Sequence, residues 1–97
     1  MALVINSNTL TNRTPGHLVL KGGCGSYRID RGTSLIIYDE FVVQRLTVDP
    51  VTWLAEPEFR LSEGFQYIVK VTTRGLEFTG EDGTHALFSK RESVTIL

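Results

Sequence analysis

The residues able to act as nucleophiles, bases or metal ligands are few and widely spaced. One cysteine, Cys24, and two histidines, His17 and His85, occur among 97 residues. A cysteine nucleophile needs a base to form the thiolate and a third group to orient that base, for which Asp30 is a candidate. No spacing recommends this combination, and glycines flank Cys24 on both sides. We therefore expect Cys24 to be a non-catalytic thiol in a loop, and we expect that the protein is not an enzyme.

The glycine-rich residues 21–26 are the second pattern to test for chemistry. A phosphate-binding loop needs a helix after its glycines and a lysine at the far end. Here Lys21 stands in front and a strand pattern follows, so we interpret the stretch as a flexible hairpin turn. Two histidines and one cysteine show no metal-ligand spacing. We expect no metal and no cofactor.

Two pairs of carboxylates, at residues 39–40 and 81–82, lie in predicted turns. Acidic side chains in turns usually bond to the backbone and favour solubility. We expect no acid–base role for either pair.

The overall charge excludes some partners. The net charge is −1, which provides no electrostatic reason to bind nucleic acid or a membrane. The first 48 residues carry a net charge of +2 (five basic, three acidic) and the rest −3 (five basic, eight acidic), an asymmetry that could favour head-to-tail association. Aromatic and basic side chains of the types that bind single strands are nevertheless present, namely Tyr27, Arg28, Tyr38 and Arg74.

Compartment is predicted from cysteine use and from the N-terminus. A single cysteine excludes an internal disulfide and fits a reducing compartment. The first residues lack a charged region and a long apolar run, so we expect no secretion by a signal peptide. No apolar run approaches membrane-spanning length. We expect the protein in a virion or in a host cytoplasm, without a membrane partner.

The clearest structural pattern lies in residues 65–89. Two-residue turns are predicted at Arg74-Gly75 and Asp82-Gly83, where glycine supplies positive φ. These turns pair Val71 with Phe78, and Phe78 with Leu87, in a three-stranded meander. Period-two alternation predicts a buried face in the first strand, made of Phe65, Tyr67, Val69, Val71 and Thr73.

Further strands are predicted outside residues 65–89. Strands are predicted near residues 2–5, 17–21, 27–29, 34–38, 41–48, 59–61 and 93–97. Residues 30–32 should form a hairpin loop with Gly32 in the left-handed region. Residues 34–48 form either a hairpin or one bent strand. Residues 35–37 are continuously apolar, so both of their faces could be covered.

Inward-facing positions and one helix complete the prediction. Within 41–48, alternation favours Val42, Leu46 and Val48 facing inward. Asp49 as a cap, Pro50 at the first helical position and Pro57 as a stop predict a short helical turn near 50–56. The expected fold is all-β: a small single-domain barrel or β-sandwich of about nine short strands.

The N-terminus is predicted to be an extended arm. Residues 1–16 comprise a short strand and a polar, turn-rich segment, and residues 17–97 form the β domain. An arm with little to bury suits strand addition to another sheet. Its candidate interaction residues are Leu3, Val4, Ile5, Leu10 and Arg13. Deleting residues 1–12 should then leave a folded domain that associates more weakly.

These features favour a non-enzymatic structural or interaction protein. We expect a subunit of a larger homomeric assembly, such as a virus or bacteriophage particle, in a capsid-decorating or tail/neck position. Its partners are expected to be copies of itself, a larger particle, or both. The alternatives are a small monomeric inhibitor or adaptor of a host protein and a single-stranded nucleic-acid-binding β-barrel.

Overall fold

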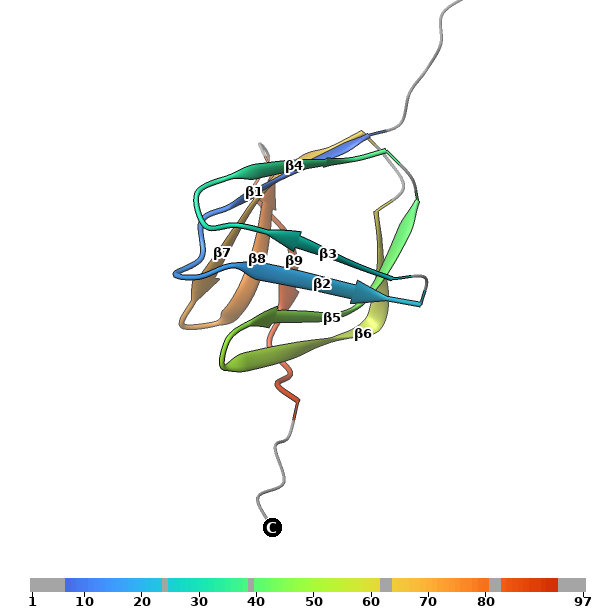
Figure 1. Ribbon diagram of the computed structural model, residues 1–97. Helices are drawn as coiled ribbons and strands as arrows, with labels where there is room; N and C mark the ends of the chain where they lie inside the picture. Colours follow the sequence, from blue (N-terminus) through green and yellow to red (C-terminus); the bar gives the residue numbers. More distant parts are fainter. Residues whose placement is uncertain (1–6, 24, 39, 62–63, 81–82, 93–97) are drawn as a thin grey trace, which may run out of the picture.

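The protein folds as a β-sandwich-like domain of two sheets (Figure 1). The computed structural model describes residues 7–23, 25–38, 40–61, 64–80 and 83–92. These contain nine strands: β1 (Asn8–Asn12), β2 (Leu18–Gly22), β3 (Gly25–Ile29), β4 (Ser34–Ile37), β5 (Phe41–Val48), β6 (Val51–Leu61), β7 (Gln66–Thr72), β8 (Gly75–Gly80) and β9 (Gly83–Phe88). One sheet has the order β4-β1-β7-β8-β9 and the other β3-β2-β5-β6. The predicted all-β fold is confirmed, and it is the sandwich alternative.

The core lies between the two sheets. Strands β1, β2 and β7 contribute alternate side chains to it, as period two requires, whereas β8 is buried at four consecutive residues. Trp53 and Phe78 are the largest fully buried side chains. Phe59 packs edge-on against Phe78 and Phe88, with ring centroids 5.4 and 5.7 Å apart. Such edge-to-face pairs add to the burial term.

The first hairpin of the meander has its turn one residue earlier than predicted. Thr72 pairs with Gly75 and Val69 pairs with Phe78. Gly75 is the first residue of β8, and glycine is needed there because any Cβ would collide with the carbonyl of Phe88. Each residue's partner therefore moves by two positions, which is an even number and keeps the same face. The predicted register is wrong, and the predicted apolar face is confirmed only for Tyr67 and Val69. Phe65 and Val71 are 40% and 38% exposed, and Thr73 is exposed as well.

The second hairpin departs further from its prediction. Gly83 has the expected positive φ of 109° but lies in β9, paired with Gly80. A bulge leaves His85 between the partners of Phe78 and Thr79. The Gly80–Gly83 pair shifts the predicted register by two positions, and the bulge shifts it back by one. Phe78 therefore pairs with Ala86 and not with the predicted Leu87.

The predicted helical turn near 50–56 is wrong. Asp49 and Pro50 form the turn of a hairpin, and the following residues belong to β6, paired with β5. Trp53 and Ala55 are buried at period two. The cap and proline signals are local, and tertiary pairing with β5 outweighs them.

Residues 34–48 form neither a hairpin nor one bent strand. β4 lies in the five-stranded sheet and β5 in the four-stranded sheet. In β5 a bulge at Gln44 switches the inward phase, so Phe41 and Val43 are buried where Val42 was predicted. Leu46 and Val48 face inward as predicted.

The expectation of an irregular arm with little to bury is wrong for residues 8–12. These residues form β1, which pairs antiparallel with β4 and parallel with β7. Leu10 is 0% exposed, and Asn8 and Asn12 are also buried. The predicted strands at residues 2–5 and 93–97 lie outside the described residues.

Candidate interaction site

Of the residues considered for catalysis, His17 and Asp30 both contact Arg28, whereas His85 lies elsewhere. Cys24 lies outside the described residues. His17 is at the end of the sandwich that holds the β1–β2 connection, where its Nδ1 is 3.4 Å from Arg28 Nη2. His85 is near the opposite end, with its ring 5.2 Å from the rings of Phe65 and Tyr67. The two imidazoles therefore cannot serve one reaction centre.

The acidic pairs also provide no site among the described residues. Glu40 forms an ion pair with Arg60 at 2.6 Å, while Asp39, Glu81 and Asp82 fall outside the description. Within the described ranges there is no group of three or more side chains able to hold a metal ion. Nor does any helix in that part of the chain have the length and apolarity to cross a membrane.

The aromatic and basic residues considered for nucleic acid do not form one surface. Tyr27 packs against Phe41 with ring centroids 4.9 Å apart, so it belongs to the edge of the core. Arg28 forms an ion pair with Asp30 at 3.4 Å. Tyr38 and Arg74 lie at opposite ends of the sandwich, because β4 and β7 run in opposite directions on either side of β1.

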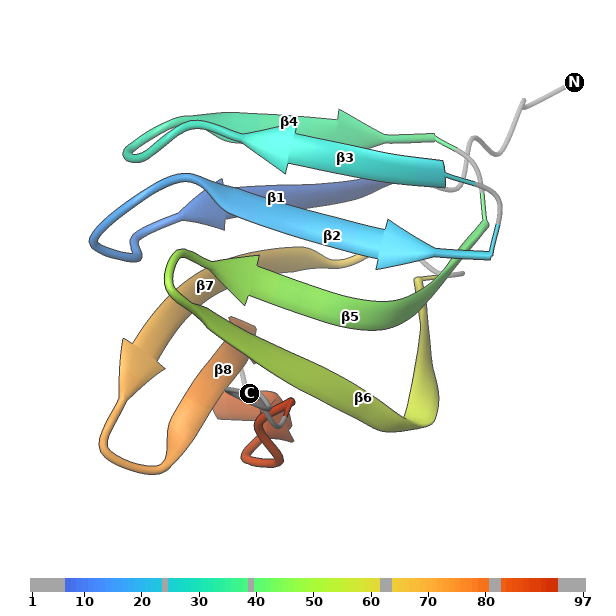
Figure 2. The same cartoon turned by 60° about the horizontal axis from the view of Figure 1, so that its bottom comes forward.

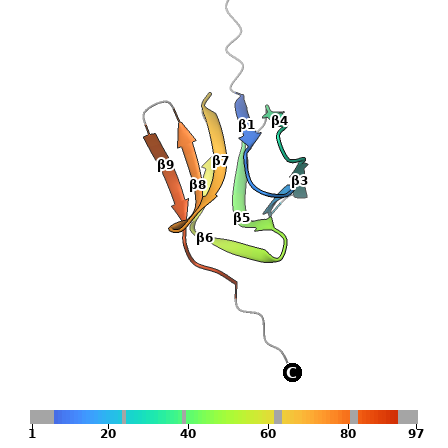
Figure 3. The same ribbon diagram turned by 90° about the vertical axis from the view of Figure 1, so that its left-hand side faces the viewer.

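The edges of the two sheets are the places where another chain could add. A strand at an edge presents unpaired backbone groups, which proteins usually guard with charges, proline, bulges or covering chain. The five-stranded sheet ends at β4 and β9, which Figure 3 shows on opposite sides of the molecule. The four-stranded sheet ends at β3 and β6.

Three of these edges are guarded. β6 carries Glu56, Pro57 and Glu58, and residues 90–92 run along it with backbone bonds of 2.8 Å from Leu54 to Lys90 and from Glu92 to Thr52. β3 carries a charge at Arg28. β9 contains the bulge at His85 and lies against β6.

Within the part of the chain that the structure describes, the edge at β4 has no such guard. Its residues, Ser34–Ile37, include no charge, no proline and no bulge. Figure 2 shows β4 along the margin of the molecule, with β3 as its neighbour in the other sheet. Among the described strands only β1 pairs with it. By the usual rules of edge protection, β4 is the strand most open to addition.

The backbone groups that face outward from β4 follow from the bonds of β1. Thr9 N donates to the carbonyl before β7 at 3.0 Å, whereas Asn12 N donates to the carbonyl before β4 at 2.9 Å. Alternate residues of a strand point their N–H and C=O groups to opposite sides. Leu35, which pairs with Leu10, therefore points toward β1. The groups facing the open side are those of Ser34 and Ile36, with Tyr38 continuing the alternation.

The side chains at this edge are apolar and exposed. Ile36 is 49% exposed and Tyr38 61% exposed. Both extend from the outer face, while Ile37 on the core face is buried. Ile68 on β7 is also exposed on the outer face, two strands away. The expectation that both faces of residues 35–37 are covered is therefore wrong for Ile36.

Of the five residues predicted for interaction, the structure describes Leu10 and Arg13. Leu10 is in the core and cannot contact a partner without unfolding. Arg13 is exposed in the connection from β1 to β2. Leu3, Val4 and Ile5 lie outside the described residues.

Comparison with protein-family models, with curated protein sequences and with solved structures gave no match. The sequence did hold one signal for β4 that was missed, the absence of charge and proline from residues 34–38. That signal has meaning only for an edge strand, and strand order comes from the fold.

Proposed function

We propose that this protein is a non-enzymatic structural protein that associates with copies of itself through the open edge of β4. The observation that carries the proposal is the contrast between this edge and the three guarded ones. Backbone bonds along an open edge supply affinity, and the exposed side chains beside it supply specificity. A second copy is the partner we favour because the edge is complementary to itself.

The self-complementarity concerns both register and face. A two-fold axis perpendicular to the sheet and passing through Ile36 pairs this residue with its copy and Ser34 with Tyr38 of the second copy. All of these residues point their backbone groups outward, so the axis allows up to about six new hydrogen bonds. The axis also keeps each side chain on its own face. Two five-stranded sheets would then join edge to edge.

We place this association in a larger homomeric assembly, such as a capsid-decorating or tail/neck position in a virus or bacteriophage particle. The support is architectural: a small β domain with an edge available for addition suits such repeated contacts. In the alternative function, a monomeric inhibitor or adaptor, the same edge would accept a strand from a different protein.

The first experiment measures association by sedimentation over a concentration series. We expect Ile36→Lys to weaken self-association about tenfold or more, because two like charges would face each other across the axis. Ile68→Lys is the matched control, since it places the same charge on the same sheet face but within a central strand. The control should change the dissociation constant by less than about twofold.

The second experiment tests the register. In a Cys24→Ser background, Ile36→Cys should form a disulfide-linked dimer, because Cα atoms about 5.5 Å apart suit a disulfide. Ile68→Cys in the same background should not. Amide exchange provides a reading without substitution: Ile36 should become protected as concentration rises, while Leu35 should be protected throughout.

A wild-type chain that stays monomeric at high concentration, and that binds no particle, contradicts the proposal. An assembly that Ile36→Lys leaves intact contradicts the assignment to β4. A monomer whose Ile36 amide becomes protected only when another protein is added would favour the adaptor alternative.

A further inference from the structure

A hollow at one end of the sandwich is lined by charged side chains, unlike the uncharged β4 edge. It has a volume of about 570 Å³ and lies where the β1–β2 and β3–β4 connections meet the end of β7. Its charged lining residues are two arginines, Arg13 and Arg31. Pro15 and Val71 provide apolar surface beside them.

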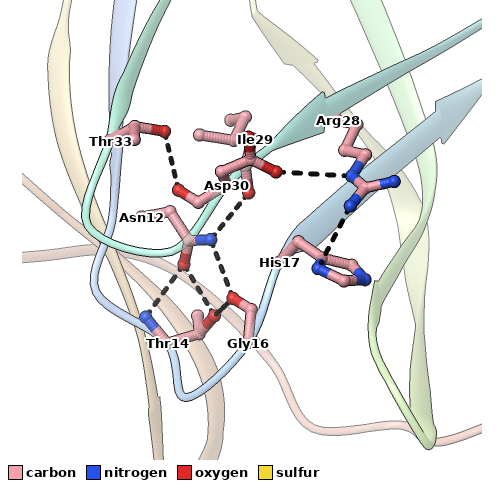
Figure 4. A network of polar contacts seen from close by, with 8 residues as sticks. All are labelled: Asn12, Thr14, Gly16, His17, Arg28, Ile29, Asp30 and Thr33. Carbon is pink, nitrogen blue, oxygen red and sulfur yellow. Dashed lines mark hydrogen bonds and ion pairs between the residues drawn. The ribbon is translucent and has the colours of Figure 1, made fainter.

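The wall behind the arginines is held by a buried polar network (Figure 4). Asn12 is 0% exposed, and its Nδ2 donates to the carbonyls of Gly16 and Ile29 at 2.9 and 2.8 Å. Its Oδ1 accepts from the backbone N and the hydroxyl of Thr14 at 2.9 and 2.6 Å. One side chain thus ties the connection that carries Arg13 to the end of β3.

Backbone bonds continue this attachment on both sides. Gly32 N donates to Asn12 O, and Arg13 N donates to Val69 O, each at 2.8 Å. The main chain at Arg13 and next to Arg31 is therefore fixed in the folded state. Less conformational entropy is lost when a ligand binds between groups that are already positioned.

The two arginines at this hollow form no ion pair with the carboxylates that the structure describes. Four other basic side chains form ion pairs with carboxylates: Arg28, Arg45, Arg60 and Lys90. Within the described residues neither Arg13 nor Arg31 does so. The adjacent carboxylate, Asp30, is engaged by Arg28 at 3.4 Å. Two guanidinium groups thus line one hollow whose described lining residues include no carboxylate.

We propose that this hollow binds the phosphate group of a small phosphorylated molecule. Guanidinium groups match the oxygens of phosphate with paired, charge-assisted hydrogen bonds. Arg13 and Arg31 would hold the phosphate from two different connections, and the organic part would lie against Pro15 and Val71. A hollow of this size accommodates a ligand larger than phosphate itself.

The site is separate from the proposed self-association. Neither arginine lies on β4, and the outward backbone groups of that strand are not among the lining of the hollow. Binding of phosphate and assembly can therefore be measured independently on the same chain.

The test is a titration of the full chain with inorganic phosphate and with ribose 5-phosphate, at an ionic strength held constant with chloride. We expect amide shifts in NMR at residues 12–14 and 31–32, and tighter binding of the sugar phosphate. Arg13→Gln and Arg31→Gln should each weaken binding about tenfold, the loss expected for a hydrogen bond to a charged group. Asn12 is left unchanged in all variants because it supports the fold.

The matched control is Arg74→Gln, which removes one exposed arginine at the same end of the sandwich but outside the hollow. It should change the affinity by less than about twofold. Equal losses for Arg74→Gln and Arg13→Gln, or shifts that chloride reproduces, overturn the proposal. Binding that requires an oligonucleotide and grows with its length also overturns it, and favours the nucleic-acid alternative.

Discussion

β4 and β6 are both edge strands, which present unpaired backbone groups, but only β6 is protected. β6 has charges and a proline, and residues 90–92 of its own chain are bonded along part of it. β4 is short, uncharged and bonded on one side only among the described strands. An edge covered by its own chain has fewer unpaired backbone groups, whereas an open edge leaves them available to another strand. The proposed self-association at β4 rests on this difference.

The largest effect on stability is expected from deleting β1, the strand that pairs with β4. Deleting residues 1–12 removes β1 and with it the only described strand paired to β4. Loss of a fully buried leucine alone costs about 2–5 kcal/mol, and a small domain has about 5–15 kcal/mol in total. We expect the truncated chain to lose its cooperative melting transition in circular dichroism. Buried Leu10 thus reverses the sequence-based expectation that this truncation leaves a folded domain.

Deletion of residues 1–6 alone is the control for this truncation. It keeps every strand described here, so a cooperative transition should remain. If the chain lacking residues 1–12 also melts cooperatively at an unchanged temperature, the fold does not require β1. Without β1, the open edge of that sheet would be β7.

An intermediate effect on stability is expected from removing a backbone hydrogen bond that residues 90–92 make along β6. Glu92→Pro removes the N–H that bonds to Thr52 O, which should lower the free energy of unfolding by about 1 kcal/mol. Glu92→Ala is the control, because it keeps the N–H and removes only the exposed ion pair with Arg45 at 3.2 Å. Urea denaturation measures both. Identical losses would mean that residues 90–92 do not protect the β6 edge through the backbone.

The smallest effect is expected from a charged contact beside the same edge. Lys90 Nζ lies 2.6 Å from Glu56 Oε2, with side chains 63% and 56% exposed. Lys90→Ala should lower the free energy of unfolding by about 0.5 kcal/mol or less, and high salt should abolish the difference. Urea denaturation at low and high salt is the measurement. A large loss that persists in salt would show that this contact secures the β6 edge.

Strand positions were predictable to different degrees for physical reasons. The meander was predicted because residues 66–88 alternate and have glycines at the strand ends next to the turns. Its registers were wrong, since Gly75 is required within a strand by its approach to Phe88 and since His85 bulges. The helical turn near 50–56 failed because caps act locally, whereas Trp53 is buried through pairing with another strand.

The candidate sites were less predictable than the strands. Arg13 was singled out as part of an arm, yet its neighbour in the hollow is Arg31, 18 positions later in the chain. Ile36 lies in an apolar run, for which the sequence allowed both faces to be covered, yet it is exposed. In both cases the sequence does not show which connection or strand lies next to the residue in the folded protein.

The sequence by itself determined the class of this protein. Period-two alternation, β-branched residues and turn glycines suffice for an all-β domain, because those preferences act over a few neighbouring residues. The tertiary structure decided that residues 8–12 form an interior strand, that Ser34–Ile37 is an open edge, and that Asn12 joins two connections. These outcomes depend on pairing between residues far apart in the chain. Such pairing is selected by burial of the whole core, and no local pattern encodes it.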